Sequence, residues 1–416
     1  MRRLLLVLSL AALAAGCSRR DRSNPLDPAN PSTGGRPAGF NAIAGLSSVK
    51  LMWAPQPGLG IDGFQLQRQR PGDAAFRALG SVLPPTSSSY IDGGVLNGER
   101  VRYRLYYVLH GATENLPAED EATPGALRPW VVEVGGSHLT RLTPDGRDVL
   151  FRSSGLGQVQ SLAVSPATGA VWCSASYDGR LSWCDPGGNP QLQLTGLHQP
   201  FSIALSPQDG SAWVCELSGQ VAHIGSDGIA RAPGTIAPLD DPQGIAVSPR
   251  DFSVWICERL GNHVLHYGPT GTPLGTTTLP QPSRVAMDSL ANLTWVASYG
   301  TGRLWILNAV GAVLDSTLQV SGPVGIAVDR ARGRVWIADA VAGRLLALDP
   351  VTLDELFRVS GLPGAWDVSV DPGSGEAWVT VRGLNEVVRV GLDGTILDRC
   401  GGLSDPIEVR LDPGGP

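Results

Sequence analysis

The stretch VWIADAVAGRLLALD at residues 335–349 carries a pattern that recurs along most of this chain. Its apolar residues alternate up to a break of small residues at Ala342-Gly343 and then alternate again, which is typical of two antiparallel strands joined by a turn. Six similar stretches are VWCSASYDGRLSWCD at 171, AWVCELSGQVAHIGS at 212, VWICERLGNHVLHYG at 254, TWVASYGTGRLWILN at 294, AWVTVRGLNEVVRVG at 377 and the looser PWVVEVGGSHLTRLT at 129.

A tryptophan in each copy sets the period. The gaps from Trp130 to Trp378 are 42, 41, 42, 40, 41 and 42 residues, which indicates a repeat architecture. Each repeat has four strand-like segments, which in the sixth are VGIAVD at 324, VWIAD at 335, RLLALD at 344 and LFRVSG at 356. Four antiparallel strands in about 40 residues make one blade of a β-propeller.

A second recurring segment gives the number of blades. It reads SLAVSP at 161, SIALSP at 202, GIAVSP at 244, RVAMDS at 284, GIAVDR at 325, DVSVDP at 367 and EVRLDP at 408. No such segment precedes Trp130, and IEVRLDP at the end has no repeat of its own, so the last strand is expected to complete the first blade. We therefore predict a seven-bladed β-propeller over 127–416, with the tryptophans in its core and Ile407, Val409 and Leu411 buried.

The repeats resemble those of NHL and YVTN-type propellers. The resemblance rests on the order P-x-G-I-A-V-D, V-W-I-A-D and G-R-L, which is clearest in the fifth and sixth repeats. The Gly-His and Trp-Asp marks of WD40 repeats are missing at the matching positions. This resemblance covers the whole propeller and implies its fold, while a propeller fold by itself carries many functions.

Residues 37–126 have a different pattern. SVKLMWA, GFQLQRQ, FRALGSV, SSYIDGG, RVRYRLYYVL and PAEDEATPG are short alternating segments separated by turn residues, which predicts an antiparallel sandwich with Trp53 in its core. On VKLMW, SSSYID and YRLYYV this stretch resembles a fibronectin type III domain. Val101 stands where that family has a corner tyrosine, and Tyr103 follows two residues later. The whole chain is thus predicted to be all-β, a sandwich followed by a propeller.

The first residues, MRRLLLVLSLAALAAGC, have the layout of a secretory signal: two arginines, a short apolar run and small residues before a cysteine. They resemble a bacterial lipoprotein signal peptide over 1–17, in which Cys17 becomes the lipid-modified first residue. Ala14 stands where that family usually has leucine. Residues 18–36 are rich in Pro, Asn, Asp, Ser and Gly and are predicted to form a flexible, extended tether.

Composition narrows the classes of partner. The chain of 416 residues has a formal net charge of −6, a single lysine and no basic run with interleaved aromatic residues after the signal, which disfavours nucleic-acid binding. In an exported protein the five remaining cysteines would meet an oxidising compartment. A two-residue Asp178-Gly179 turn would place Cys173 opposite Cys184 as a disulfide, although buried free thiols fit the strands equally well. No cysteine or histidine cluster has zinc-site spacing.

Polar residues recur on one predicted face, where inner strands begin and second strands end. The candidate ligand-binding residues there are His198, Glu216, Glu258, Arg284, Asp339, Asp367 and Glu408. Clustered carboxylates suit a divalent cation or a small polar ligand. The alternative is that the acids after the tryptophans cap turns or pair with arginines, as in non-enzymatic NHL repeats. No cofactor and no catalytic residue is assigned, and a divalent cation is left open.

Related propellers occur in two enzyme families. Gluconolactonase-like hydrolases hold a divalent ion in the channel and usually have six blades, and virginiamycin B lyase-like enzymes use histidine and glutamate around magnesium. Here the six histidines are scattered, and only His198 falls on the candidate face. Gly-x-Ser-x-Gly, the mark of a nucleophile elbow, does not occur.

These observations favour a non-enzymatic binding or scaffold protein of a bacterial cell envelope, lipid-anchored to the outer membrane or cell surface. A protein or carbohydrate partner would be held on the propeller face, and the chain is expected to be a monomer. A metal-dependent lyase or hydrolase at the channel mouth, virginiamycin B lyase-like or gluconolactonase-like, is the alternative.

Replacing the lipidated residue tests the anchor. Cys17→Ala should move the protein from the membrane fraction to a soluble or uncleaved form, measured by fractionation and N-terminal sequencing. Cys400→Ala is the matched control and should leave fractionation unchanged. A wild-type protein that is soluble after export, with a free N-terminus at Ser18 or later, would show that there is no lipid anchor.

Overall fold

The computed structural model describes residues 24–114, 116–317 and 320–412, and its chain forms two compact units. The first unit runs to Ala122, apart from two short segments, and the second begins at Thr123. The predicted signal peptide, Cys17 and residues 18–23 lie outside the described residues. Among the described residues, no helix has the length and apolar character needed to span a membrane.

The described part of the tether is not extended. Residues 24–36 wind through successive turns, and Asn30 is 7% exposed. The Asn30 amide donates to the Asn24 carbonyl at 3.0 Å and its oxygen accepts from Ser32 N–H at 2.9 Å. Asn and Asp side chains bond nearby backbone groups in this way and so favour turns, which the composition alone did not reveal.

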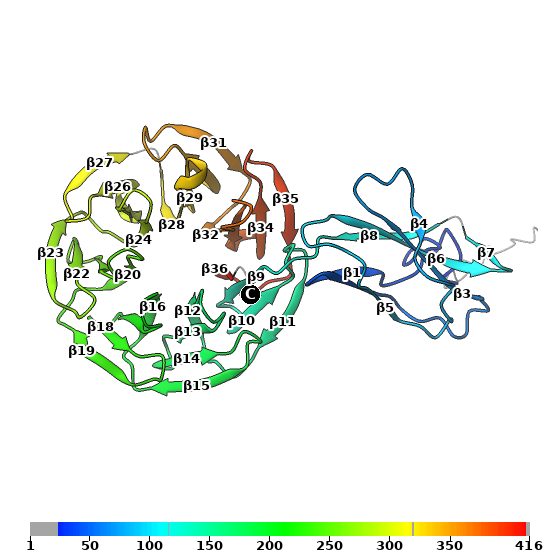
Figure 1. Ribbon diagram of the computed structural model, residues 1–416, viewed down its shortest axis with the longest axis horizontal. Helices are drawn as coiled ribbons and strands as arrows, with labels where there is room; N and C mark the ends of the chain where they lie inside the picture. Colours follow the sequence, from blue (N-terminus) through cyan, green and yellow to red (C-terminus); the bar gives the residue numbers. More distant parts are fainter. Residues whose placement is uncertain (1–23, 115, 318–319, 413–416) are drawn as a thin grey trace, which may run out of the picture. The chain divides into compact units, whose positions relative to one another are not determined.

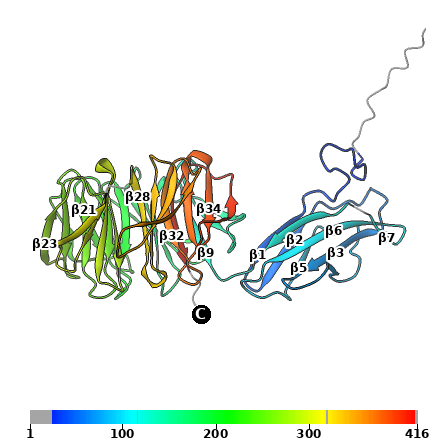
Figure 2. The same ribbon diagram turned by 90° about the horizontal axis from the view of Figure 1, so that it is seen from above.

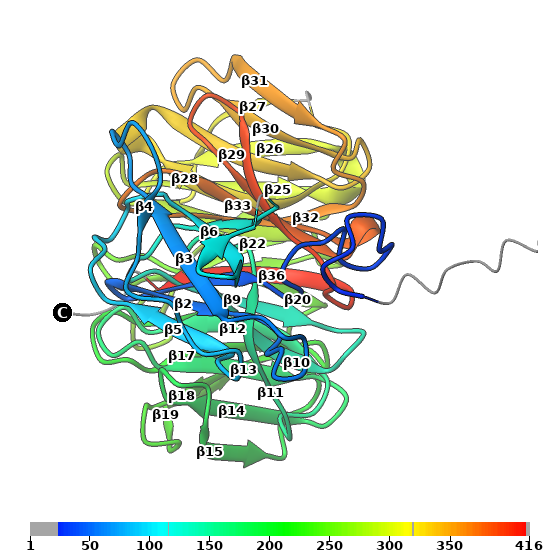
Figure 3. The same cartoon turned by 90° about the vertical axis from the view of Figure 1, so that its right-hand side faces the viewer.

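Two antiparallel sheets make up the first unit (Figure 3). One sheet has the order β1-β2-β5 and the other β4-β3-β6-β7, with β8 also paired to β6. Trp53 is 4% exposed in the core, and the buried Tyr103 hydroxyl donates to Asp92 at 3.0 Å. The strands are β1 (Asn41–Gly45), β2 (Ser48–Met52), β3 (Gly63–Gln69), β4 (Arg77–Ala78), β5 (Ser89–Asp92), β6 (Val101–Leu109), β7 (Ala112–Thr113) and β8 (Ala118–Ala122).

Seven four-stranded antiparallel sheets form the second unit, a closed seven-bladed propeller (Figure 1). The inner strands are β36 (Pro406–Asp412), β12 (Val159–Val164), β16 (Pro200–Leu205), β20 (Pro242–Val247), β24 (Arg284–Asp288), β28 (Pro323–Asp329) and β32 (Ala365–Val370). The second strands are β9 (Arg128–Glu133), β13 (Val171–Ala175), β17 (Ala212–Glu216), β21 (Val254–Glu258), β25 (Leu293–Ser298), β29 (Arg334–Asp339) and β33 (Ala377–Val381).

The outer half of each blade completes the disc, and the strands run through its thickness (Figure 2). The third strands are β10 (His138–Leu142), β14 (Arg180–Cys184), β18 (Gln220–Ile224), β22 (His263–Tyr267), β26 (Arg303–Leu307), β30 (Arg344–Leu348) and β34 (Glu386–Val390). The outermost strands are β11 (Val149–Ser153), β15 (Pro190–Thr195), β19 (Ala230–Ile236), β23 (Pro273–Thr278), β27 (Val313–Thr317), β31 (Glu355–Ser360) and β35 (Ile396–Cys400). Three short 3-10 helices are η1 (Tyr299–Thr301), η2 (Arg330–Arg332) and η3 (Arg382–Leu384).

The tryptophans are core residues, as predicted: each is at most 2% exposed. Trp336 packs with Val368 and Val388 of the next blade, while Ile337 beside it packs with Trp295 of the preceding blade. Alternate side chains of a second strand therefore enter different interfaces, as the pleat requires. The same arrangement repeats around the ring.

Closure by the C-terminal strand is confirmed. β36 pairs with β9 from Pro406↔Glu133 to Asp412↔Arg128, and Arg128 donates to Asp412 at 3.2 Å. The sequence predicted that Ile407, Val409 and Leu411 are all buried, which was wrong in part. Val409 is buried, but Ile407 and Leu411 are half-buried. A register shift between Pro406 and Glu408 turns Ile407 toward the channel instead.

The predicted pairing of Cys173 with Cys184 was out by two residues. Four residues, 176–179, separate β13 from β14, so Cys173 lies opposite Ser182 and Cys184 opposite Val171. The two thiols are diagonal neighbours on one face, joined by a hydrogen bond. The five cysteines of the described chain are free and buried, and burial raises the pKa of the Cys215 thiol to about 12.

Removing β36 should open the ring. Truncation after Asp405 deletes the inner strand of the first blade, including Val409, whose burial alone is worth roughly 1.5–3 kcal/mol. Because β36 also supplies a whole ladder to β9, the loss is large against a typical folding free energy of about 5–15 kcal/mol. We expect aggregation or a strongly lowered propeller melting temperature, measured by calorimetry. Truncation after Asp412 keeps β36 and should melt normally. Normal melting of the shorter chain would contradict closure.

Candidate functional site

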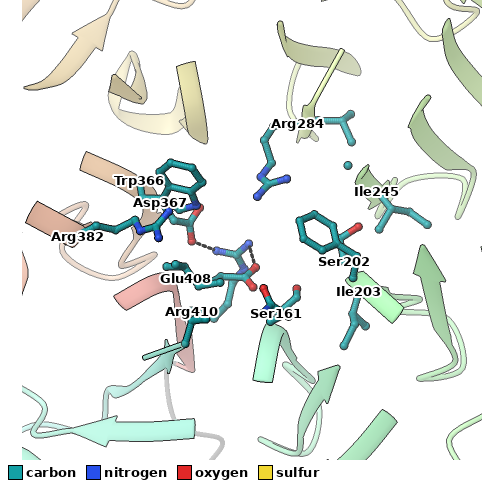
Figure 4. A pocket seen from close by; sticks show the side chains of 16 residues that line it. Ser161, Ser202, Ile203, Ile245, Arg284, Trp366, Asp367, Arg382, Glu408 and Arg410 are labelled. Atoms are coloured by element: carbon teal, nitrogen blue, oxygen red, sulfur yellow. Dashed lines mark hydrogen bonds and ion pairs between the residues drawn. The ribbon is translucent and has the colours of Figure 1, made fainter. Parts of the chain in front are cut away.

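A pocket of about 200 Å³ lies around the propeller axis, where the inner strands begin (Figure 4). Three of the predicted site residues, Arg284, Asp367 and Glu408, line it. Phe201, Trp366 and Ile407 supply much of its apolar surface. The pocket has the liquid volume of about seven water molecules, which suits a small ligand or one end of a larger ligand.

β-Bulges put side chains into this pocket. Six of the seven inner strands show a register shift at their start, near Gln160, Phe201, Gln243, Val324, Trp366 and Ile407. A bulge leaves an extra residue without a ladder partner and re-aims its side chain. Gln160, Phe201, Trp366 and Ile407 reach the pocket wall in this way. Because the bulge recurs in most blades but the bulged residue differs, these blades present different side chains to the pocket.

Glycines allow neighbouring inner strands to approach closely. A Cβ atom at Gly244 would lie 2.8 Å from the Ser283 carbonyl oxygen and 2.9 Å from the Arg284 Cα. At Gly325 it would lie 2.8 Å from the Asp367 Cα. Larger residues would therefore push β24 away from β20 and β32 away from β28. The two glycines fix the positions of Arg284 and Asp367 at the pocket.

Glu216, Glu258 and Asp339 do not line the pocket; they are buried at the ends of the second strands. Glu216 accepts the N–H of His198, and Glu258 accepts that of Asp240 at 2.7 Å. Both donors lie in loops that lead from the preceding blade into the inner strand. These carboxylates therefore hold the chain segments that enter the ring.

Asp339 acts similarly and has a cationic partner as well. It accepts the N–H groups of Ser321 at 3.2 Å and Gly322 at 2.9 Å, and Arg344 donates to it at 3.0 Å. Glu133, on the second strand of the first blade, accepts the N–H of Ser404 at 2.6 Å. These acids have the contacts expected of the capping alternative.

His198 lies away from the pocket and is largely exposed. Its side chain is 71% exposed, with Nδ1 3.5 Å from Glu216 Oε2, and it borders a shallow depression beside Tyr177. Two other histidines are buried against tryptophans: His223 stacks on Trp213 at 3.8 Å and His266 on Trp255 at 3.9 Å between ring centroids. In the described residues no histidine lines the pocket.

Asp367 and Glu408 share one arginine on the pocket wall. Arg410 donates to Asp367 at 2.5 Å and also to Glu408, as Figure 4 shows. Asp367 further accepts the N–H of Val409 at 3.0 Å, and Glu408 that of Leu162 at 2.9 Å. Each carboxylate therefore bonds the backbone of the next blade. Burial raises the pKa of Glu408, Arg410 opposes this shift, and the charge of Asp367 adds to it.

Two further arginines line the pocket, and only one of them forms an ion pair with a carboxylate in the described chain. Arg382 donates to both oxygens of Asp405, at 2.6 and 2.8 Å, and lies 4.4 Å over the Trp366 ring. Arg284 donates to the Ser283 carbonyl oxygen at 3.3 Å and lies 5.9 Å from the Phe201 ring. Within the described chain no carboxylate pairs with Arg284, which extends into the opening in Figure 4.

Phe201, Trp366, Arg382 and Arg410 are among the pocket residues that the sequence analysis did not single out. The sequence held a signal for one of them, Arg410. The third position of the recurring inner segment is Ala or Ser in six repeats, and Arg410 breaks this pattern in the last one. Phe201 and Trp366 stand where a bulge occurs, and the strand alternation does not reveal bulges. In the described chain no group of three or more His, Cys, Asp or Glu side chains is arranged to hold a metal ion.

Solved structures share the propeller fold at low sequence identity. A functionally unknown protein from Desulfotomaculum acetoxidans is 15% identical, with a TM-score of 0.60, over 69% of this chain and 99% of that protein. Virginiamycin B lyase from Staphylococcus aureus is 18% identical, with a TM-score of 0.52, over 59% of this chain and 84% of the lyase. A streptogramin B lyase is 15% identical, with a TM-score of 0.53, over 68% and 97%.

These likenesses establish the fold alone. No protein-family model matches the chain, and no curated protein matches its sequence. A catalytically inactive histidine-to-alanine variant of the Staphylococcus aureus lyase has been solved with quinupristin; it is 17% identical over 63% of this chain and 97% of the lyase, with a TM-score of 0.53.

The raised pKa of Glu408 predicts a pH dependence of stability. The folded protein holds this proton more tightly than the unfolded chain, so the stabilisation is complete below the ordinary pKa of 4.5 and is lost as pH rises through the raised value. Relative to Glu408→Gln, wild type should lose melting temperature between pH 4 and pH 8. The outer-strand control Glu355→Gln should parallel wild type. A wild-type advantage that grows with pH would mean that Arg410 lowers the pKa instead.

Proposed function

We propose that this chain is a non-enzymatic binding protein of a bacterial cell envelope, with its ligand held at the propeller pocket. The observation that carries the proposal is that the pocket carboxylates already have structural partners. Asp367 and Glu408 bond Arg410 and the backbone of neighbouring blades. A carboxylate that already bonds an arginine and the backbone of the next blade is poorly placed to become the ligand of a metal ion.

The hydroxyl groups of the pocket support the same proposal. Ser202 donates to the Gln243 carbonyl oxygen at 2.5 Å, and Glu408 hydrogen-bonds Ser161. A serine nucleophile needs a neighbouring base that accepts its proton. Ser202 bonds a main-chain carbonyl, which is not a base, and the carboxylate beside Ser161 is already bonded by Arg410 and Leu162 N–H. The described pocket walls hold no histidine. What remains is a cavity with apolar walls and a few polar groups held by hydrogen bonds, which is typical of a ligand site.

The envelope location rests on the sequence. The signal that resembles a lipoprotein signal, with Cys17 as the modified residue, would place the mature protein on a membrane, with the outer membrane or cell surface favoured. The fibronectin type III-like unit would be a spacer, and the NHL-like propeller would carry the ligand. We propose a monomer whose partner is a protein or a carbohydrate.

The metal-dependent lyase remains the second candidate, because virginiamycin B lyase shares the fold. Incubation of the purified full chain with quinupristin and Mg²⁺, followed by chromatography, separates the two functions. We expect quinupristin to be recovered intact, with less than stoichiometric bound metal by mass spectrometry and no change of melting temperature with Ca²⁺ or Mg²⁺. The Staphylococcus aureus lyase is the positive control. Loss of quinupristin that EDTA prevents would establish the lyase instead.

A further inference from the structure

We propose that the pocket binds a small organic monocarboxylate, with the carboxylate on Arg284. This assignment rests on the proposed binding function and names the class of ligand. Arg284 begins β24, and its backbone lies close to that of Gly244 in the neighbouring inner strand. Its planar guanidinium is the group that best matches the two oxygens of a carboxylate.

The charges around the axis favour this arginine over the other two. Arg410 is hydrogen-bonded to Asp367 and Glu408, and Arg382 to both oxygens of Asp405. A ligand anion would have to displace those carboxylates. Among the described residues, Arg284 hydrogen-bonds a main-chain carbonyl and lies near an aromatic ring, and it forms no ion pair with a carboxylate. It therefore offers donors to a ligand without breaking an ion pair.

The opposite wall limits the charge of the ligand. Arg410 carries one positive charge between two carboxylates, so this wall does not attract a second anionic group when both are ionised. In Figure 4 it faces Arg284 across the opening. A ligand should therefore carry its negative charge at the Arg284 end and an uncharged body at the other. This excludes dicarboxylates and doubly charged phosphate as preferred ligands.

The remaining walls suit such a body. Phe201, Ile203, Ile245 and Trp366 provide apolar surface. The carboxylate could belong to a free organic acid or to a sugar acid at the end of a carbohydrate. Both would use the same contact with Arg284. Benzoate and glucuronate represent the two sources, and benzamide and glucose are their uncharged counterparts.

Isothermal titration calorimetry on the purified full chain tests the assignment. Wild type should bind benzoate or glucuronate and should bind its uncharged counterpart and inorganic phosphate at least tenfold more weakly. Arg284→Gln should weaken carboxylate binding by about 30-fold or more, the usual result of removing one partner of a close charge pair. Arg284→Lys should restore part of it. Arg303→Gln, in the same blade but outside the pocket, should bind as wild type does.

Each other result overturns the assignment. Equal binding of benzamide and benzoate, or of phosphate and benzoate, would show that a monocarboxylate is not recognised. Unchanged binding by Arg284→Gln would place the anion elsewhere. If wild type binds neither acid, the ligand class is wrong; the quinupristin assay fails or succeeds independently of this result, because it reports whether the protein is a lyase. Melting curves of the variants confirm that a loss of binding is not a loss of fold.

Discussion

The antiparallel pairing of β36 with β9 is the constraint on which the propeller depends. Each blade covers one face of its neighbour, so an open row of blades would leave apolar faces uncovered at both ends. Trp378 of the last blade packs with Val131 and Val409, which come from the two ends of the propeller sequence. Because β36 sits in the first blade, every interface in the ring is the same kind of contact. Closure brings the starts of all inner strands together around one axis, and the pocket lies there.

Buried acids solve a second problem that closure creates. Every blade must be entered by a loop that crosses from the outer edge of the preceding sheet, and its backbone N–H groups need acceptors. Glu133, Glu216, Glu258 and Asp339 provide them. An acidic residue can therefore occur at the same position of several repeats for a structural reason. Such recurrence alone is weak evidence that the residue belongs to a ligand site.

The sequence predicted the fold better than the site. The tryptophan period and the unpaired IEVRLDP were enough for the blade number and the closure, since both depend on patterns that repeat seven times. Position within the repeat also placed Arg284, Asp367 and Glu408 at the starts of inner strands, where they line the pocket. It did not separate them from Glu216, which lies one strand further out. Bulges at Phe201 and Trp366, and a four-residue hairpin loop between Cys173 and Cys184, change side-chain direction or register without changing the apolar pattern.

The specific chemistry of the pocket lies where the repeat is broken. The backbone around the axis is close to sevenfold, and a ring of identical side chains would offer a ligand seven equal positions. Arg410 replaces a small residue, and Arg284 stands where two other blades have glycine. These departures put a paired arginine on one wall and a carboxylate-free arginine on the other. The two walls of a nearly sevenfold pocket are therefore chemically different. A small ligand with one charged end has a single favourable orientation between them.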